Sequence, residues 1–216
     1  MIIFGMEKGK YIEYEPNGKG KEYHSFFDRL IFEGEYLNGK RNGKGKEYNY
    51  EGVLLFEGEY LNGKRNGKGK EYNKYGELIF DGDYINDKRW NAKGNVKEYD
   101  IREKLIYEGG YINGKRNGKG KEYNADGELI FEGEFLNGER WIGKGKEFTF
   151  DKLSFEGEYL NGKRNGKGKE YYSTNGNIYF EGEYLNGKRN GKGKEYNLAG
   201  EIIFEGEYLN GIRVKG

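Results

Sequence analysis

One segment recurs along almost the whole chain and constrains its fold more than any other feature. The segment F-E-G-E-Y-L-N-G-K-R-N-G-K-G-K-E-Y begins at Phe32. It returns, with variations, at Phe56, Phe80, Tyr107, Phe131, Phe155, Phe180 and Phe204, and a degenerate copy begins near Glu7. Successive starts from Phe32 onward are 24 to 27 residues apart. This period predicts one array over residues 1–216, with nine units and atypical caps at both ends.

Inside each unit the side chains alternate with a period of two. The segment L-I-F-D-G-D-Y-I at 78–85 places Leu, Phe, Gly and Tyr on one face of a strand, and Ile, Asp, Asp and Ile on the other. The following N-G-K-R-N-G is rich in residues that tolerate positive φ and predicts a hairpin connection. K-G-K-E-Y predicts the return strand, and a second turn, such as 73–76 or 124–127, leads to the next copy. Each unit is therefore expected to be one β-hairpin.

The composition predicts an unusual core. Hydrophobic residues make up only 34% of the chain, but 17% of the residues are aromatic and 39 are Gly. Glycine weakens a strand unless a bulky group lies close over the backbone. We therefore expect rings from neighbouring strands to cover Gly34, Gly43 and Gly45, so that a thin aromatic layer replaces a conventional core. Acidic and basic residues balance within a unit, which favours Glu–Lys pairs across strands.

The expected fold class is all-β. Neighbouring strands lie about 4.8 Å apart, and sheets of more than about ten strands twist and curl. About nine tandem hairpins should therefore form an elongated, twisted antiparallel sheet, or solenoid.

The core motif Y/F-E-G-E-Y-x-N-G-K-R-x-G-x-G followed by Tyr resembles the MORN repeat (membrane occupation and recognition nexus). The longer unit is similar to variant MORN repeats in long arrays of protists and bacteria, some of them presumed antitoxins. The resemblance implies a hairpin array that acts as a scaffold, dimeriser or tether, in some cases beside a membrane or the cytoskeleton. Lipid binding does not carry over directly, because the units of this chain are charge-neutral.

Charge and composition restrict the partners and the compartment. The net charge is +1, so no global field attracts nucleic acid or an anionic membrane. The chain has no Cys, and neither a signal-peptide segment nor a membrane span is recognisable. These features predict a cytoplasmic protein. Repeated Tyr with Lys could form a track for single strands or polysaccharide, but an aromatic layer with balanced Lys explains the same pattern.

The residues do not assemble a catalytic or metal-binding set. His24 is the only histidine, and we expect it to be an ordinary cap residue. The string G-K-R-N-G-K-G-K lacks the Ser or Thr and the helix that a phosphate-binding loop requires. Glu33 and Glu35 recur identically from unit to unit, which is typical of solvated cross-strand partners rather than glycosidase acids. The sequence thus predicts no enzyme, no cofactor, no metal and no small-molecule substrate.

The departures from the repeat supply candidate contact residues. Trp90 and Trp141 replace an Asn of the hairpin connection, next to Arg89 and Arg140, and their connections are longer by three residues and one residue. Exposed Trp beside Arg is typical of binding hot spots. On one shared rim the rings would lie roughly 20 Å apart. Alternatively, each ring folds back onto its own hairpin.

A second candidate surface is a basic turn edge. It consists of Lys40, Arg41, Lys64, Arg65, Lys115, Arg116, Lys163, Arg164, Lys188 and Arg189.

Three functions fit these features. The first is a non-enzymatic scaffold for protein–protein interaction or self-association. The second is a peripheral module that binds anionic lipid or another polyanion through the basic turn edge, and the third is an antitoxin-like repeat protein of bacterial type. Near-identical copies are also typical of a consensus-like design.

Overall fold

The structure is a computed structural model that describes residues 2–7, 9–92 and 94–214, and all regular elements in these ranges are β-strands. The first sheet contains β1 (Ile3–Glu7), β2 (Lys10–Tyr14), β3 (Lys19–His24), β4 (Arg29–Leu37), β5 (Lys40–Tyr48), β6 (Leu54–Leu61), β7 (Lys64–Tyr72), β8 (Leu78–Ile85) and β9 (Lys88–Ala92). The second contains β10 (Val96–Tyr99), β11 (Leu105–Ile112), β12 (Lys115–Tyr123), β13 (Leu129–Leu136), β14 (Glu139–Thr149), β15 (Lys152–Leu160), β16 (Lys163–Tyr171), β17 (Ile178–Leu185), β18 (Lys188–Tyr196), β19 (Ile202–Leu209) and β20 (Ile212–Arg213).

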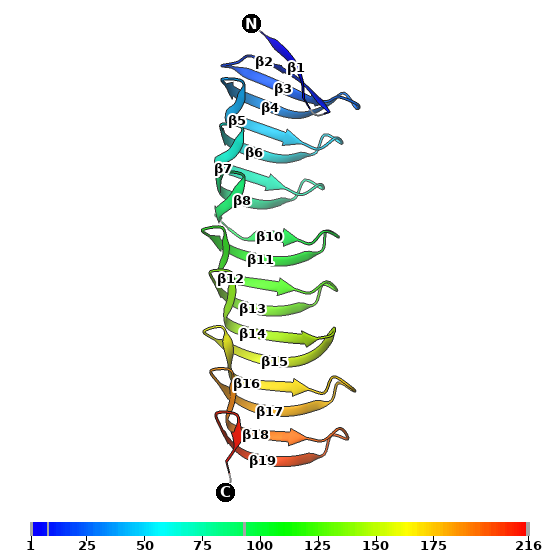
Figure 1. Cartoon of the computed structure of the whole chain (residues 1–216), viewed down its shortest axis with the longest axis vertical. Coiled ribbons are helices and arrows are strands. Elements are labelled where there is room, and N and C mark those ends of the chain that lie inside the picture. The colour runs from blue at the N-terminus through cyan, green and yellow to red at the C-terminus, as the bar shows by residue number, and fades with distance from the viewer. Residues whose placement is uncertain (1, 8, 93, 215–216) are drawn as a thin grey trace. The chain divides into compact units, whose positions relative to one another are not determined.

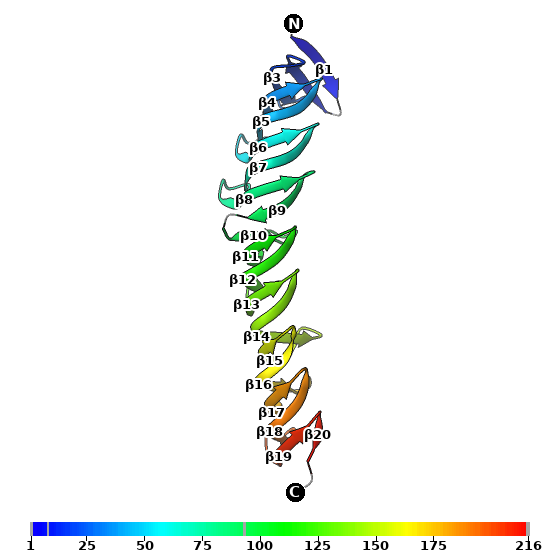
Figure 2. The same ribbon diagram turned by 90° about the vertical axis from the view of Figure 1, so that its left-hand side faces the viewer.

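In both sheets, strands that follow one another in the sequence are neighbours in space (Figures 1 and 2). This confirms the all-β antiparallel array of hairpins. The boundary between the sheets falls between β9 and β10, in the copy that carries the three-residue insertion. The chain forms two compact units: Met1–Glu98 with Gly110–Lys115, and Tyr99–Gly109 with Arg116–Gly216. The elongation of the whole array and its single-domain character stay predictions.

The hairpin turn is shorter than the sequence pattern indicates. Asn38 and Gly39 have φ of 51° and 73°, and strand β5 begins at the next residue, Lys40. Positive φ at both central residues is the signature of a two-residue type I′ turn, for which Asn-Gly is the preferred pair. The predicted six-residue connection N-G-K-R-N-G was therefore wrong in its extent, because its last four residues belong to the return strand.

Each regular hairpin contains a bulge where the return strand is longer than its partner. Gly34 lies opposite Gly45 and Tyr36 lies opposite Arg41, so β5 has extra residues between these two pairs. Gly43, with φ of 85°, lies in this stretch beside the carboxylate of Glu35. That carboxylate accepts a hydrogen bond of 3.1 Å from the backbone N–H of Lys44. The prediction of an aromatic ring over Gly43 was wrong, since a glutamate occupies that place.

The aromatic layer itself is confirmed. The side chain of Phe32 is fully buried, and its ring lies over Gly34 and Gly45. A Cβ added to Gly45 would come within 2.6 Å of the Phe32 ring and 3.1 Å of the Tyr60 ring from the next hairpin. The Phe32 and Tyr60 rings meet edge to face, with centroids 5.3 Å apart, which is a favourable aromatic geometry. In the regular repeats, the Phe of one hairpin thus lies on bare backbone and is covered by a Tyr from the following hairpin.

The face assignment of 78–85 holds for its second half only. Phe80, Gly82 and Tyr84 are buried as predicted, but Leu78 is exposed and Ile79 is buried. The register shifts between Tyr72 and the preceding residue, and this reverses the alternation before Phe80. Several links between hairpins are Asx turns: the side chain of Asn73, for example, accepts backbone N–H groups at positions 75 and 77, both at 3.0 Å.

The glycine row gives a direct test of this packing. A Cβ on Gly58 would lie 2.6 Å from the carbonyl oxygen of Lys68 and 2.7 Å from the Cα of Gly69, so backbone would have to move. We expect Gly58→Ala to lower the free energy of unfolding by about 1–3 kcal/mol, as overpacking does. Gly94 has open space around it, so Gly94→Ala should change stability by less than about 0.5 kcal/mol. Denaturant unfolding compares the two variants, and equal losses would contradict the packing.

Candidate interaction surfaces

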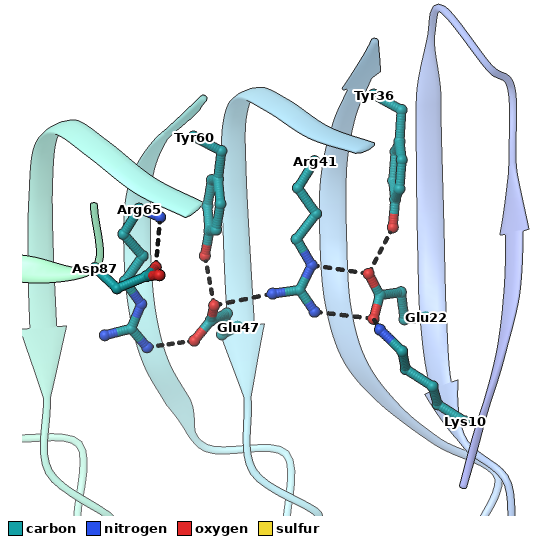
Figure 3. Close-up of polar contacts among 8 residues, drawn as sticks. All are labelled: Lys10, Glu22, Tyr36, Arg41, Glu47, Tyr60, Arg65 and Asp87. Atoms are coloured by element: carbon teal, nitrogen blue, oxygen red, sulfur yellow. Dashed lines mark hydrogen bonds and ion pairs between the residues drawn. The ribbon is translucent and has the colours of Figure 1, made fainter. Parts of the chain in front are cut away.

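Arginine and glutamate side chains form a ladder of ion pairs across successive hairpins (Figure 3). The guanidinium of Arg41 donates two hydrogen bonds to Glu22, of 2.8 and 2.9 Å, and one of 3.0 Å to Glu47. Glu47 in turn accepts a hydrogen bond from Arg65 of the next hairpin. The same pattern recurs in the second compact unit, where Arg189 bridges Glu170 and Glu195. The ladder therefore couples neighbouring hairpins within each unit.

Aromatic side chains enclose this ladder. The guanidinium carbon of Arg41 lies 3.9 Å from the centroid of the Phe32 ring, which is cation–π geometry. The hydroxyl groups of Tyr36 and Tyr60 donate to Glu22 and Glu47, each at 2.8 Å. One Phe, Arg, Glu and Tyr per repeat thus act together. Fixed Arg and Glu positions in each copy were a sequence signal for this ladder, but a prediction restricted to Glu–Lys pairs missed it.

Partial burial and ion pairing act in opposite directions on the ladder carboxylates. Burial alone would raise the pKa of Glu22, but hydrogen bonds from Arg41, Lys10 and Tyr36 outweigh it and lower that pKa to about 2. The pKa of Glu47 is lowered by the same balance, with Arg65 as the principal partner. These carboxylates are therefore ionised at neutral pH.

Acid should destabilise the protein through this ladder. The folded-state pKa of Glu22 lies below its ordinary value of 4.5, so its contribution is complete above that value and is lost as pH falls toward about 2. We expect the denaturant midpoint to decline over this range. The Glu22→Gln variant should show a shallower decline, because its side chain does not titrate. Identical pH profiles for the two proteins would contradict this assignment.

The opposite face of the sheet carries stripes of charge that the core does not use. In the first unit, β5 presents Lys44 and Lys46 on either side of Gly45, and β6 presents Glu57 and Glu59. Lys44 lies opposite Glu59 and Lys46 opposite Glu57, which confirms the expected cross-strand arrangement of Glu and Lys. The glycines between these charged residues face the Phe rings of the opposite side, so only backbone separates the charges on this face. These rows and glycines from β3 to β8, together with residues of β2 such as Tyr14, line a shallow groove of about 1050 Å³.

The second unit has the same groove, with a volume of about 1090 Å³. Its lining runs from β13 to β19 and alternates Glu, Lys and Glu strands around a row of glycines. The charged side chains stay accessible to solvent although they form ion pairs within the chain. The side chains of Lys194 and Glu205 are 3.2 Å apart, and they are 39% and 61% exposed. Each groove therefore presents both signs of charge.

The family profile described as MORN repeat matches residues 32–52, 56–74, 107–128, 155–177 and 180–197. The chain is a MORN-repeat protein. Membership of this family indicates a repeat scaffold, and MORN repeats generally form non-catalytic modules. The hairpins that start at residues 80 and 131 lie outside the matched segments, and these two carry the tryptophan insertions.

No curated protein matches this MORN chain. Among solved structures, the computationally designed Ika8 protein, crystallised in P63, is similar at 10% identity. That match covers 96% of this chain and 86% of the designed one, with a TM-score of 0.20, which is too low to support an argument.

The two components of the predicted basic edge lie in different environments. Its Arg members belong to the ladder. The side chain of Arg41, for instance, is only 21% exposed. Its Lys members are exposed, and Lys40, Lys64, Lys163 and Lys188 each lie opposite an exposed leucine across the MORN hairpin turn. Lys40 is paired with Leu37, and Lys64 with Leu61; these leucines are 48% and 50% exposed. The surface of this edge is therefore a Leu–Lys row rather than a Lys–Arg row.

The two tryptophans lie in return strands, not in the turns. Trp90 is in β9 and Trp141 in β14, and both are half-buried. Their carbonyl groups each accept a 3.0 Å hydrogen bond from a glycine of the following turn, Gly114 and Gly162. A Cβ on Gly114 would lie 3.6 Å from the Trp90 ring, and one on Gly162 would lie 4.0 Å from the Trp141 ring. Each ring thus lies close to a turn glycine of the next hairpin, and its folding back onto its own hairpin stays a prediction.

The insertion at Trp141 also changes the strand register. Gly133 lies opposite Gly143, whereas the regular repeat would place it opposite Gly145. A shift of two residues keeps every side chain on its original face, while a shift of one would turn the aromatic face outward. The hairpin therefore absorbs a one-residue insertion without losing its core.

The adjacent arginines belong to the ladder. Arg89 donates to Glu71 at 2.8 Å, and Arg140 donates to Glu122 at 2.7 Å. A binding role for these Trp–Arg pairs and the roughly 20 Å spacing of the two rings stay predictions.

The other two candidate residues, His24 and Glu33, form hydrogen bonds within the fold. The Nδ1 atom of His24 accepts backbone N–H groups of Phe26 and Phe27 at 3.3 and 3.4 Å, within the β3–β4 turn. Glu33 accepts the hydroxyl of Tyr48 at 2.8 Å. Within the ranges that the structure describes, no cluster of three or more His, Asp or Glu side chains could hold a metal ion. None of the described segments forms a helix long and apolar enough to cross a membrane.

Proposed function

We propose that this MORN-repeat protein is a non-catalytic scaffold whose charge-striped face binds protein. The observation that carries the proposal is the groove of each unit, which is lined by half-exposed Lys and Glu rows. The opposite face is occupied by the aromatic layer and the ladder. The striped face is thus a repeated surface whose side chains the core does not use.

The charge pattern favours a protein over a polyanion. A polyanion would gain attraction at the Lys strands and meet repulsion at the Glu strands, which lie about 4.8 Å away. A protein surface can place both signs at that spacing, and electrostatic complementarity of this kind provides specificity.

Site-specific cross-linking tests this proposal. A photoreactive side chain is placed at Lys167, in the groove of the second unit, or at the control position Ala125, an exposed residue of the link between β12 and β13. We expect irradiation of the full chain in its host cells to join a defined protein to position 167 and not to position 125. Equal labelling at both positions, or none, would argue against a binding role for the groove.

A second candidate function rests on the Leu–Lys row at the hairpin turns. Exposed aliphatic groups beside lysines suit the interface of an anionic membrane. Sedimentation with vesicles that contain phosphatidylserine tests it, since binding should weaken as salt rises. Retention that is independent of salt and of the Lys40→Glu/Lys64→Glu changes would exclude this mode.

The tryptophans stay a proposed secondary contact. A pull-down with the intact chain and with Trp90→Ala/Trp141→Ala compares capture of the cross-linked partner. We expect weaker capture by the variant if the rings contribute directly. Unchanged capture would assign the rings to packing alone.

A further inference from the structure

The stripes of the second unit follow one rule, which determines what surface can match them. Each strand carries two charges of the same sign on the groove face, and the sign reverses at the next strand. β14, β16 and β18 present Lys pairs, and β15, β17 and β19 present Glu pairs. Pairing partners prove the alternation: Lys167 lies opposite Glu183, and Lys169 lies opposite Glu181. Stripes of equal sign therefore repeat at roughly 9.6 Å, twice the strand spacing.

A complementary surface must show the same stripes displaced by one strand. A second copy of this chain has such stripes, because it has the same sheet. We infer that the striped face of the second unit binds the striped face of another copy, with Lys strands over Glu strands. This inference rests on the proposed function and specifies the partner.

The alternation of charge from strand to strand determines how the two copies can be arranged. Consider a two-fold axis parallel to the strands and midway between β16 and β17. It places β16 of one copy over β17 of the other, and β15 over β18, so every facing pair of strands has opposite signs. An unshifted two-fold axis along the array would place each strand over itself and oppose like charges. In the favoured pair the two arrays of strands therefore run antiparallel. A displacement by an odd number of strands brings opposite charges together, whereas a displacement by an even number brings like charges together.

The contacts of such a pair add to those already present. Glu205 is 61% exposed beside Lys194, so a facing lysine can approach it from the open side. The stems of Lys and Glu also supply apolar contact between the faces.

Two charge-reversal variants test the inference with purified full-length protein. The acidic variant is Lys167→Glu/Lys169→Glu, and the basic variant is Glu181→Lys/Glu183→Lys. In the pair described above each variant alone opposes like charges, whereas a mixture restores opposite signs at both strands. Sedimentation at about 0.05 M salt should show self-association of the unaltered chain, which weakens at about 0.5 M. Each variant alone should associate at least about tenfold more weakly.

The mixture of the two variants is the decisive arm. Recovered association of the mixture cannot arise from a folding defect in either variant, and circular dichroism confirms the strand content of both. A monomeric chain at low salt, variants that associate like the unaltered chain, or a mixture that stays monomeric would each overturn the inference. Retained cross-linking to a different protein from position 167 would then leave the scaffold function standing.

Discussion

The Phe56→Ala variant is expected to lose about 3–5 kcal/mol of unfolding free energy, the usual cost of removing a buried phenylalanine. The side chain of Phe56 is fully buried. Its ring lies over Gly58 and Gly69, and its centroid is 5.1 Å from that of Tyr84. The guanidinium carbon of Arg65 is 4.2 Å from the same centroid. One substitution therefore leaves two bare glycines and one arginine without their common partner.

The two tryptophans allow this loss to be assigned to one unit. Trp90 belongs to the first compact unit and Trp141 to the second. Fluorescence in a Trp141→Phe background should show the midpoint of the first unit falling in Phe56→Ala. In a Trp90→Phe background the second unit should shift less, because repeats interact mainly with their nearest neighbours.

A matched control lies on the same strand. Leu61 is in β6 and is 50% exposed. The Leu61→Ala variant should change stability by less than about 0.5 kcal/mol. Comparable losses in Leu61→Ala and Phe56→Ala would show that the aromatic layer is not the core.

The hairpin array could be predicted from the sequence because the same strand and turn signals recur in eight or more copies of the repeat. Period-two alternation marks the strands, and Asn-Gly marks a type I′ turn. The prediction for Gly45 also held: a glycine inside a strand often marks a close approach to the backbone, and here the Phe32 ring makes that approach. These features depend on neighbours within one hairpin or its adjacent strands.

The ladder and the exact turn could not be read in the same way. K-R-N-G contains turn-forming residues, but the bulge at Gly43 places Lys40 and Arg41 in a strand. The direction of the Arg41 side chain depends on Glu22, 19 positions earlier in the chain. Such a pair follows from strand register, which the sequence did not determine. The Leu–Lys row was missed for the same reason, because it becomes visible only when the turn is reduced to two residues.

Arginine in the ladder should be as important as the aromatic core. The Glu22 side chain is 2% exposed, and Arg41 supplies two of its hydrogen bonds. We expect Arg41→Met to cost about 3–5 kcal/mol, because it leaves a buried carboxylate with only part of its compensation. Lys44→Met, an exposed change on the same strand, should be close to neutral.

A double variant separates the cost of an unpaired charge from the loss of arginine packing. In Glu22→Gln/Arg41→Met the carboxylate is absent, so much of the stability should return, although the contact of Arg41 with Phe32 stays lost. The pH dependence gives an independent check. Without Arg41, burial raises the pKa of Glu22, so the carboxyl group becomes neutral at a higher pH than in the unaltered chain. The deficit of Arg41→Met should therefore shrink as pH falls below about 4, the ordinary range of a glutamate. A deficit that is constant with pH would mean that Arg41 stabilises the fold by packing on Phe32 and not by neutralising Glu22.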